Sequence, residues 1–319
     1  MSSHREAVAE GVMSRSSPPR LSIMTVTWNG WQDTRRCLDS ITASALPDHE
    51  IMVIDNASQD GTPDHIERLF PNVRIVRNQR NVGHTRAVNQ GVRLAQGEYV
   101  LLLDSDTELR GNAIELMLDL LETHPDIGMV TPRTYNSDGS IQATARRFPN
   151  ALSGLFGRQS VLTRWFPNNP VTRHYLQTDG LTSTSPYEVE QISGACMLFR
   201  RSLFDAAGPW DEGYFAYWVD TDWCFKVRRC GWRIYCLPQA SVVHHEQNHA
   251  GRKKSVRRIW IFHYGAYRFY RNNMTLGTFD PRAIAAFLAL SLHGLFQFAQ
   301  NVFVAETSAA RPSAPKQQQ

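Results

Sequence analysis

Two aspartates, Asp104 and Asp106, stand one residue apart where the apolar run Tyr99–Leu103 ends. Carboxylates at this spacing can hold a divalent cation, and oxygen ligands favour Mg²⁺ or Mn²⁺. Such a cation commonly shares its remaining coordination positions with a diphosphate. A plainer interpretation is a polar cap, in which Asp106 only begins the next turn, because the motif is short and common. The motif by itself leaves both interpretations open.

The elements that must position these carboxylates follow a regular alternation. We expect four strands and four helices in turn, from Leu21–Trp28, Thr34–Ser44, His49–Ser58, Thr62–Phe70, Val73–Asn78, His84–Gly97, Glu98–Asp106 and Asn112–Pro125. The strands are apolar and β-branched, and the helices carry apolar residues at helical spacing. Strands that alternate with helices through short links predict an α/β fold with a mostly parallel sheet and right-handed crossovers.

Polar residues gather where the expected strands end. They are Thr27 and Asn29 after the first strand, Asp55 and Asn56 after the second, and Asn78 and Asn81 after the third. Asp104 and Asp106 follow the fourth. In such sheets ligands bind at the carboxyl ends of the strands, so this edge is the predicted site. Its place in the series strengthens the metal interpretation of the acidic pair.

A dinucleotide-binding fold is the obvious rival for an alternating chain. The turn after the first strand reads TWNGWQDT, with one glycine and no G-x-G-x-x-G, and the chain contains no G-x-x-x-x-G-K-[ST]. We therefore expect a cation, rather than a glycine-rich loop, to hold the phosphates.

The composition indicates a folded globular protein in a reducing compartment. The chain has 319 residues, of which 42% are hydrophobic, and a formal net charge of +4. Its five cysteines are scattered and odd in number, which does not suggest a disulfide framework, so we expect a cytoplasmic protein. Residues 1–18 and 306–319 are expected to be a disordered lead-in and a disordered tail, and the lead-in contains no apolar stretch typical of a signal peptide.

The C-terminal third combines cations, aromatic residues and an apolar segment. The run GRKKSVRR (Gly251–Arg258) precedes an aromatic stretch, and Ala283–Ala305 is mostly apolar but contains His293 and Gln297. These polar residues make it a poor free-standing span, so an interfacial helix at the inner face of a membrane fits better. The alternative is a helix packed on the protein's own catalytic domain. Nothing outside the basic run supports nucleic acid as a partner.

Five motifs at family spacing resemble the family 2 glycosyltransferases of GT-A fold, and most closely their bacterial rhamnosyltransferase-like branch. They are SIMTVTWNG, IMVIDNASQDGT, VRNQRNVGHTRAVNQGV, GEYVLLLDSDTEL and the stretch from Ile192 to His245. The resemblance covers about Leu21 to His245. It implies a catalytic domain over residues 19–250, with a nucleotide-sugar half at 19–135 and an acceptor half at 136–250. A helical extension follows at 251–305.

The resemblance also implies a role for each matching residue. Thr27, Asn29 and Asp55 would hold the nucleobase and ribose, and Asn81 and Asn89 would line the nucleotide pocket. Asp104 would face the ribose or reach the metal through water. Asp106 would bind the metal directly, with His244 as a further ligand and His245 as the alternative.

The acidic group around Asp220 implies the base of an inverting transfer. Most relatives have Glu-Asp where this chain has Val219-Asp220, and the Asp of that pair usually deprotonates the acceptor hydroxyl. Asp220 is therefore the expected general base and Asp222 its substitute. The plain interpretation is that both aspartates cap the helix Thr221–Arg229, which is compatible with catalysis. Among the nearby aromatic residues, Trp218 is expected to face the acceptor.

The predicted activity is transfer of a sugar, rhamnose by resemblance, from a nucleotide-diphosphate donor to a glycan or lipid-linked acceptor in cell-surface polysaccharide synthesis. Mn²⁺ or Mg²⁺ is the expected cofactor. The rival from a different class is a non-catalytic nucleotide-sugar binding protein, and Val219 is the feature that favours it. A third hypothesis, nucleotidyl transfer, is disfavoured because TWNGWQDTRR lacks a glycine-rich, basic loop.

Overall fold

The computed structural model describes residues 17–44, 46–149, 165–166, 169–245 and 255–309. The strands are β1 (Leu21–Thr27), β2 (His49–Asp55), β3 (Val73–Arg77), β4 (Tyr99–Asp104), β5 (Thr107–Arg110), β6 (Ile127–Tyr135), β7 (Ile141–Gln142), β8 (Tyr187–Val189), β9 (Cys196–Arg200) and β10 (Arg233–His244). The helices are α1 (Trp31–Thr42), α2 (Thr62–Leu69), α3 (His84–Leu94), α4 (Ala113–Thr123), α7 (Pro170–Leu176), α8 (Thr178–Leu181), α9 (Ser202–Ala206), α10 (Val219–Arg229), α11 (Val256–Met274) and α12 (Pro281–Ala309).

One mixed sheet organises the domain. Its strand order is β3-β2-β1-β4-β9-β6-β10-β5, with β7 paired to β6 and β8 paired to β10. Strands β3, β2, β1 and β4 are parallel, and β10 is parallel to β6. Strand β9 is antiparallel to both β4 and β6. The predicted α/β fold with a mostly parallel central sheet is confirmed.

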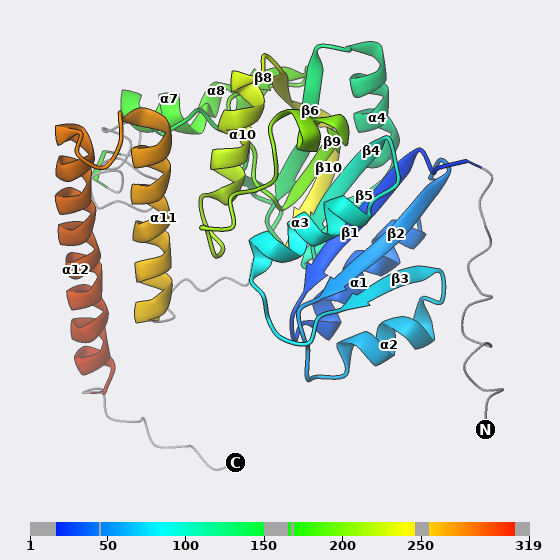
Figure 1. Ribbon diagram of the computed structural model, residues 1–319, viewed down its shortest axis with the longest axis horizontal. Coiled ribbons are helices and arrows are strands. Elements are labelled where there is room, and N and C mark those ends of the chain that lie inside the picture. Colours follow the sequence, from blue (N-terminus) through cyan, green and yellow to red (C-terminus); the bar gives the residue numbers. More distant parts are fainter. Residues whose placement is uncertain (1–16, 45, 150–164, 167–168, 246–254, 310–319) are drawn as a thin grey trace, which may run out of the picture.

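The sheet is covered on both faces, which explains why the central strands read as continuous apolar runs. Alternate residues of β4 enter two separate cores: Leu101 and Leu103 pack with α1 and α4, whereas Val100 and Leu102 pack with α3 and α10. The helices therefore form a layer on each face, as Figure 1 shows. This sandwich holds the ends of the strands rigidly.

The alternating elements lie within a few residues of their predicted ranges. The main difference follows the fourth strand. That strand ends at Asp104 rather than Asp106, and the chain turns at once into β5. β5 is a four-residue strand that pairs antiparallel with β10. Local pattern did not indicate β5, because its pairing partner lies more than 100 residues further along the chain.

Helices α11 and α12 form the extension, side by side at the flank of the molecule away from β3 (Figure 1). They pack against each other, and α11 also packs against α10. The close approach of α11 to the domain requires Gly265, since a Cβ there would lie 3.0 Å from Cδ1 of Trp218 and from the carbonyl oxygen of Tyr217.

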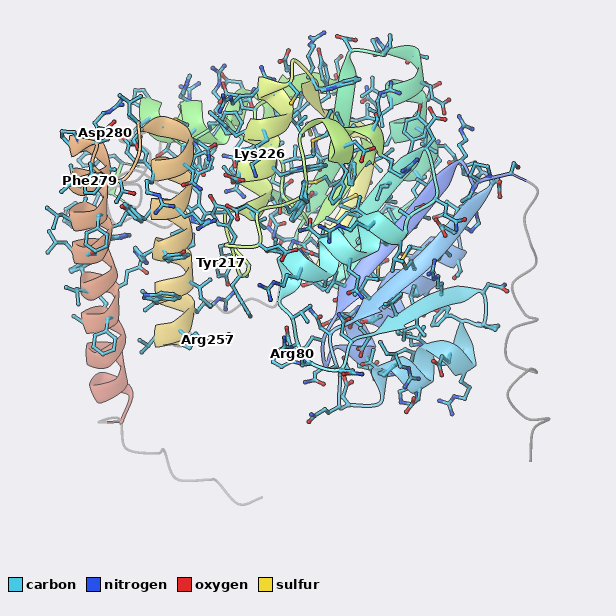
Figure 2. All side chains as sticks on the ribbon, viewed as in Figure 1. Arg80, Tyr217, Lys226, Arg257, Phe279 and Asp280 are labelled. Atoms are coloured by element: carbon cyan, nitrogen blue, oxygen red, sulfur yellow. The ribbon has the colours of Figure 1, made fainter. Side chains whose placement is uncertain are left out.

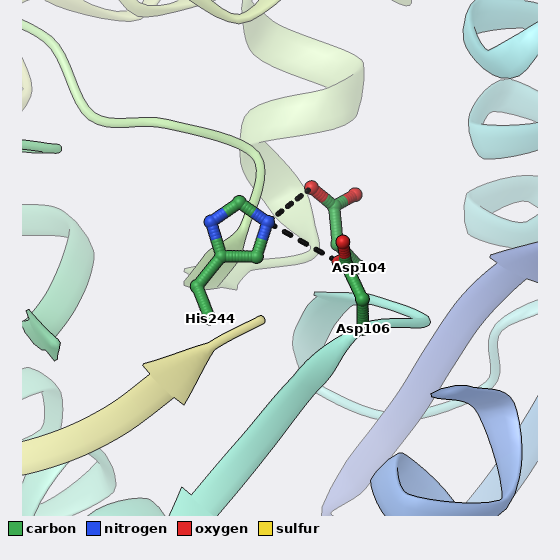
Figure 3. Close-up of side chains that lie close together, drawn as sticks. All are labelled: Asp104, Asp106 and His244. Carbon is green, nitrogen blue, oxygen red and sulfur yellow. Dashed lines mark ion pairs between the residues drawn. The ribbon is translucent and has the colours of Figure 1, made fainter. Parts of the chain in front are cut away.

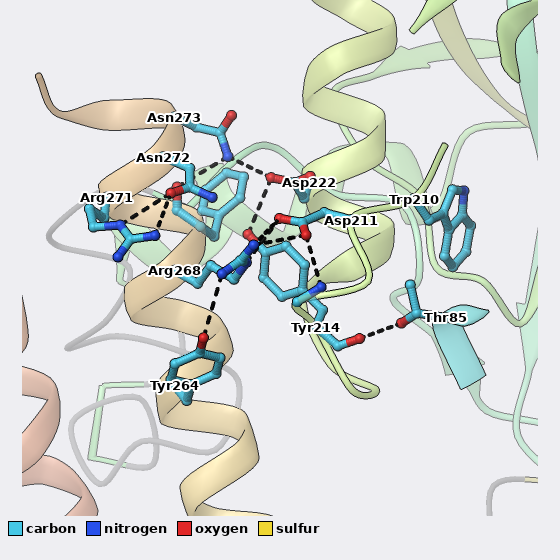
Figure 4. Close-up of polar contacts among 12 residues, drawn as sticks. Thr85, Trp210, Asp211, Tyr214, Asp222, Tyr264, Arg268, Arg271, Asn272 and Asn273 are labelled. Carbon is cyan, nitrogen blue, oxygen red and sulfur yellow. Dashed lines mark hydrogen bonds and ion pairs between the residues drawn. The ribbon is translucent and has the colours of Figure 1, made fainter. Parts of the chain in front are cut away.

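Polar contacts fasten α11 to the catalytic domain (Figure 4). The guanidinium of Arg268 donates from Nε to one oxygen of Asp211 at 2.9 Å and from Nη2 to the other at 2.8 Å. Asn273 donates to the buried carboxylate of Asp222 at 2.8 Å, and the hydroxyl of Tyr214 donates to the same oxygen at 3.2 Å. The extension is therefore docked on the segment that leads into α10.

Helix α12 keeps most of its apolar surface in solvent. By length and composition its part Pro281–Gln300 could cross a membrane, with a mean hydropathy of 1.4 and 6% of that stretch buried. Its main packing partner among the described elements is α11. The helix runs to Ala309, past residue 306, where the disordered tail was predicted to begin. Residues 1–16, 251–254 and 310–319 lie outside the described residues.

Candidate active site

Asp104, Asp106 and His244 converge at one end of the sheet (Figure 3). Nε2 of His244 lies 3.2 Å from Oδ1 of Asp106 and 3.9 Å from Oδ2 of Asp104. Asp104 ends β4 and Asp106 lies in the following turn. The β5–β10 pairing sets His244 opposite Thr107, directly beside that turn. One acidic motif and one distant histidine thus form a single cluster.

A hydrogen bond sets the tautomer of His244. Its Nδ1 lies 2.9 Å from Oε1 of Gln142, an oxygen that can only accept. Nδ1 therefore carries the proton, and in the neutral ring the lone pair of Nε2 faces the two carboxylates. A lone pair directed at carboxylate oxygens is unfavourable unless a cation or a proton lies between them. Metal-ligating histidines commonly have such a partner on the other ring nitrogen.

The two aspartates have opposite pKa shifts. Burial raises the pKa of Asp104, and the charges of Asp106 and Asp220 add to that rise, while His84 and His244 oppose it. Burial also acts to raise the pKa of Asp106, but the hydrogen bond and charge of His244 outweigh it and hold this pKa below its ordinary value. Asp106 is therefore the more readily ionised carboxylate, as expected of a direct ligand.

The donor set fits a divalent cation. One ligand atom from each of Asp104, Asp106 and His244 lies within 4.8 Å of the others. Two carboxylates and one imidazole suit Mn²⁺ and also allow Mg²⁺. His245, the alternative ligand, points elsewhere: its Nε2 lies 3.0 Å from Glu108 and its Nδ1 lies 2.9 Å from the hydroxyl of Ser137. Neighbouring strand residues face opposite ways, so only one of the two histidines can join the cluster.

Asp220 lies near Asp104 of the acidic cluster. One of its oxygens accepts from the backbone of Thr221 at 2.8 Å, and the other lies 3.4 Å from the backbone nitrogen of Gly194. The next residue, Ala195, accepts from the backbone of Asp104 at 3.1 Å. The contribution of the Asp220 charge to the raised pKa of Asp104 also shows that the two carboxylates are near each other.

The structure gives Asp222 a different role from the predicted substitute base. This carboxylate is 1% exposed, pairs with Lys226 at 2.9 Å and accepts hydrogen bonds from Tyr214 and Asn273. Asp222 thus holds α10 and α11 together. Val219 is also buried, in the core beneath α10.

The prediction that Trp218 faces the acceptor is not supported by its packing. The Trp218 ring lies 5.7 Å from the rings of both Phe262 and Phe269 of α11, measured between centroids. Its indole N–H is buried without a partner among the described residues. Its φ of +73° lies in the left-handed region, immediately before Val219 and Asp220. Trp218 therefore serves as a packing anchor for α11.

Two predicted donor residues, Thr27 and Asp55, end β1 and β2 side by side. Thr27 pairs in register with Asp55, and Val26 pairs with Asp104. Asp55 is 2% exposed; its Oδ2 accepts from the backbone of Ser58, whereas its Oδ1 has no partner among the described residues. Asn29, at φ +50°, accepts from the backbone of Gln59. A buried carboxylate oxygen without a donor suits a hydroxyl or N–H of a nucleoside.

Asn81 and Asn89, both predicted to line the nucleotide pocket, have different surroundings. Asn81 is exposed and its side chain accepts from the backbone of Gly83 in the turn before α3. Asn89 is fully buried and makes two hydrogen bonds with the backbone of Trp210. Its Nδ2 donates to the Trp210 carbonyl and its Oδ1 accepts from the Trp210 N–H, each at 2.9 Å. Asn89 therefore fastens the 210–218 segment rather than lining an open pocket.

Sequence reasoning assigned no specific role to three further residues. His84 begins α3 and lowers the pKa of Asp104 by its charge. Gln142 orients His244. Asn56 is buried and bridges Asn78 and the carbonyl of Gly83. Asn56 and His84 lie within motifs that carry the resemblance, which was an available signal. Gln142 had none, since it lies on a two-residue strand.

Comparisons with known proteins agree with this geometry. The model for glycosyl transferase family 2 matches residues 22–208. The N-acetylglucosaminyl-diphospho-decaprenol L-rhamnosyltransferase of Mycobacterium tuberculosis is 31% identical over 243 residues, which are 73% of this chain and 78% of that protein. An uncharacterised glycosyltransferase of Bacillus subtilis is 25% identical over 232 residues, which are 70% of this chain and 74% of that protein.

Solved structures share the GT-A fold. A mannosyltransferase from Pyrobaculum calidifontis in complex with GDP-Man and Mn²⁺ aligns with a TM-score of 0.55 at 20% identity, covering 94% of this chain and 78% of that one. GalNAc-T7 with UDP, GalNAc and Mn²⁺ aligns with a TM-score of 0.58 at 18% identity, covering 80% of this chain and 48% of that one. With a family model matched over more than half its length and a relative at 31% identity, the chain belongs to glycosyl transferase family 2.

Proposed function

We propose that this glycosyltransferase transfers a sugar, with rhamnose the first candidate, from a nucleotide-diphosphate donor to a lipid-linked glycan acceptor, with inversion at the anomeric carbon. The observation that carries the proposal is the cluster of Asp104, Asp106 and His244, with Asp220 nearby through the contacts of Gly194 and Ala195. The choice of rhamnose and of a diphospholipid acceptor rests on the name of the relative from Mycobacterium tuberculosis.

The chain's own residues supply the parts of a single displacement. Asp220 accepts the proton of the acceptor hydroxyl while that oxygen forms its bond to the anomeric carbon, and the bond from this carbon to the donor diphosphate breaks. Asp55, Thr27, Asn29 and Asn81 hold the nucleoside at the ends of β1 and β2. Asp106 and His244, with Asp104, would hold Mn²⁺ or Mg²⁺, which neutralises the leaving diphosphate when bound.

We also place the enzyme at the inner face of a membrane, as a peripheral protein. The support is the apolar surface of α12, where Leu288, Leu292, Leu295 and Phe296 are each more than half exposed. Between the two helices, Nδ1 of His293 lies 3.1 Å from Nε2 of His263, and the ring of Phe287 packs on Tyr267. A helical hairpin with an exposed apolar surface suits the boundary between head groups and acyl chains.

The test is a transfer assay with purified full-length protein, Mn²⁺, dTDP-rhamnose and N-acetylglucosaminyl-diphospho-polyprenol. We expect a product heavier by one deoxyhexose, formed only with the metal. UDP- and GDP-sugars are tested in parallel as donors, because the residues proposed to hold the nucleoside do not predict which nucleobase is preferred. A protein that binds donor and Mn²⁺ but transfers to none of these acceptors would instead be the non-catalytic binding relative.

A further inference from the structure

We propose that an aromatic cavity between residues 213–217 and α11 binds the diphosphate and first isoprenoid units of the acceptor lipid, with Arg257 and Arg258 on the diphosphate. The inference deepens the proposed function and rests on it for the acceptor class. It assigns a binding site outside the acidic cluster, in the part of the structure where the extension meets the catalytic domain.

The cavity has a volume of about 300 Å³, and its walls are largely aromatic. Phe215 and Tyr217 line it from the segment before α10, and Trp260 and Tyr264 line it from α11. The rings of Trp260 and Tyr264 stack with their centroids 5.2 Å apart. This volume is at the lower end of ligand sites, and aromatic walls suit an isoprenoid chain.

The cavity is open, and two of its aromatic residues have large exposed fractions. Trp260 is 63% exposed and Phe215 is 43% exposed. Large aromatic side chains that converge on a hollow and remain in water indicate a surface for a ligand. Tyr214, which also lines the cavity, is almost fully buried, as are Trp210 and Trp223 from the same stretch of sequence.

Two arginines that contact lining residues of the cavity supply positive charge. The guanidinium of Arg257 lies 4.7 Å from the ring centre of Phe215, and Nε of Arg258 donates to the hydroxyl of Tyr217 at 2.6 Å. Within the described ranges neither has a carboxylate partner in an ion pair, whereas Arg268 of the same helix is paired with Asp211. Guanidinium groups that are free to bind both oxygens of a phosphate are well suited to a diphosphate.

The cavity is lined by the segment that leads to the proposed catalytic residue and by α11 of the hairpin. Tyr217 precedes Asp220 by three residues, and Figure 2 shows Tyr217 and Arg257 between α11 and the domain. The segment is anchored from the donor side, since Thr85 of α3 donates to the carbonyl of Tyr214 at 2.6 Å. An acceptor held here has its lipid beside the hairpin and its sugar toward Asp220.

The test is calorimetric titration of the full-length protein with farnesyl diphosphate in EDTA, so that no cation holds the diphosphate at Asp104 and Asp106. We expect Arg257→Gln with Arg258→Gln, and separately Trp260→Ala, to weaken binding by about tenfold or more. Farnesol and inorganic pyrophosphate should each bind more weakly than farnesyl diphosphate. Trp260→Ala keeps the test valid if the arginine variant unfolds, because this ring is mostly in water.

Two variants serve as matched controls. Arg35→Gln removes an exposed arginine of α1, and Phe279→Ala removes an aromatic residue that is 93% exposed in the turn between α11 and α12. Both should bind farnesyl diphosphate like the wild type. Equal binding by the wild type and the cavity variants, or no binding at all, would overturn the inference.

The transfer assay separates this inference from the proposed function. If the wild type transfers sugar and the cavity variants raise the KM for the lipid acceptor alone, both stand. If it transfers sugar and the cavity variants match it, the cavity assignment fails and the function stands. If the wild type never transfers sugar but binds farnesyl diphosphate through these residues, the function fails and the binding site stands.

Discussion

Asp220 and Asp222 lie two residues apart on α10 and have unlike surroundings. Successive helical positions are turned by about 100°, so residues i and i+2 cannot share a face. Asp220 is partly exposed and contacts Gly194 near the acidic cluster, whereas Asp222 is enclosed by Tyr214, Lys226 and Asn273. The two aspartates therefore differ in role because they lie on different faces of the same helix turn.

We expect Asp220→Asn to lower transfer by roughly 10²–10⁴-fold, because a general base contributes about that factor. Donor affinity in the presence of Mn²⁺ should stay within twofold of the wild type, measured by calorimetry. Asp222→Asn is the control. It should mainly lower the melting temperature, because it weakens the attachment of α11. Full activity in Asp220→Asn would remove this residue from the mechanism.

Asp104 should reduce the stability of the metal-free enzyme. Its pKa is raised by burial, with Asp106 and Asp220 adding to the rise, so ionising it in the folded state is unfavourable. The effect is fully present above the raised folded pKa and vanishes below the ordinary carboxyl pKa. We therefore expect Asp104→Asn to raise the melting temperature by roughly 1–3 °C at pH 8 in EDTA and by nothing measurable at pH 3.

Adding Mn²⁺ should reverse that order at pH 8, since the wild type has the full ligand set and the variant does not. Thermal melts at both pH values, with and without the metal, measure all four cases. A variant that is less stable than the wild type without metal would contradict this account of Asp104.

At the scale of elements, short strands and helix ends build the site. The pairing of β5 with β10 carries His244 to the acidic turn, and helix α3 fixes the segment before α10 through Asn89 and Thr85. Neither link is local in sequence. The cluster therefore depends on the packing of the whole sheet rather than on one motif.

Asn89→Ala should destabilise the enzyme by roughly 2 kcal/mol, because it leaves the backbone N–H and carbonyl of Trp210 buried without partners. For a domain of this size that corresponds to a fall in melting temperature of about 4–8 °C. Asn81→Ala, at an exposed position of the same segment, should change stability little and weaken donor binding instead. Thermal melts and calorimetry on both variants check this contrast. If Asn89→Ala weakens donor binding at unchanged stability, the original prediction for Asn89 is right.

At the scale of the whole molecule, the α11–α12 hairpin joins a catalytic domain to an exposed apolar surface. The docking contacts of α11 are made with the same segment that carries Tyr214, Trp218 and Asp222. A shift of α11 would therefore move residues that are close to Asp220 in the chain. A membrane under α12 would bring the cavity and the catalytic residue to the surface where a lipid acceptor resides.

We expect the full-length protein to co-sediment with vesicles containing phosphatidylglycerol. Leu292→Glu with Phe296→Glu should reduce that binding by about tenfold or more, because two charges enter the apolar face. Leu69→Glu on α2 is the control, since Leu69 is also exposed, at 47%. Donor binding in solution should be the same in all three proteins. Undiminished sedimentation of the double variant would contradict the membrane assignment.

The amino-acid sequence by itself determined the alternating elements, the strand-end position of Asp104 and Asp106, and the family. These follow from local periodicity and from motifs at fixed spacing, and both can be recognised without knowing which distant segments are in contact. It also singled out His244 and Asp220, which the tertiary structure places beside Asp106 and near Asp104, respectively.

Only the tertiary structure distinguished His244 from His245. It also showed that Asn89 and Asp222 are buried in hydrogen-bond networks and that Trp218 packs on α11. Each of these outcomes depends on a contact between segments far apart in the chain: β5 with β10, α3 with Trp210, and α10 with α11. A side chain's direction is set by the register and packing of its element against such partners. The sequence pattern therefore predicts each helix or strand, but not the distant segment against which it packs.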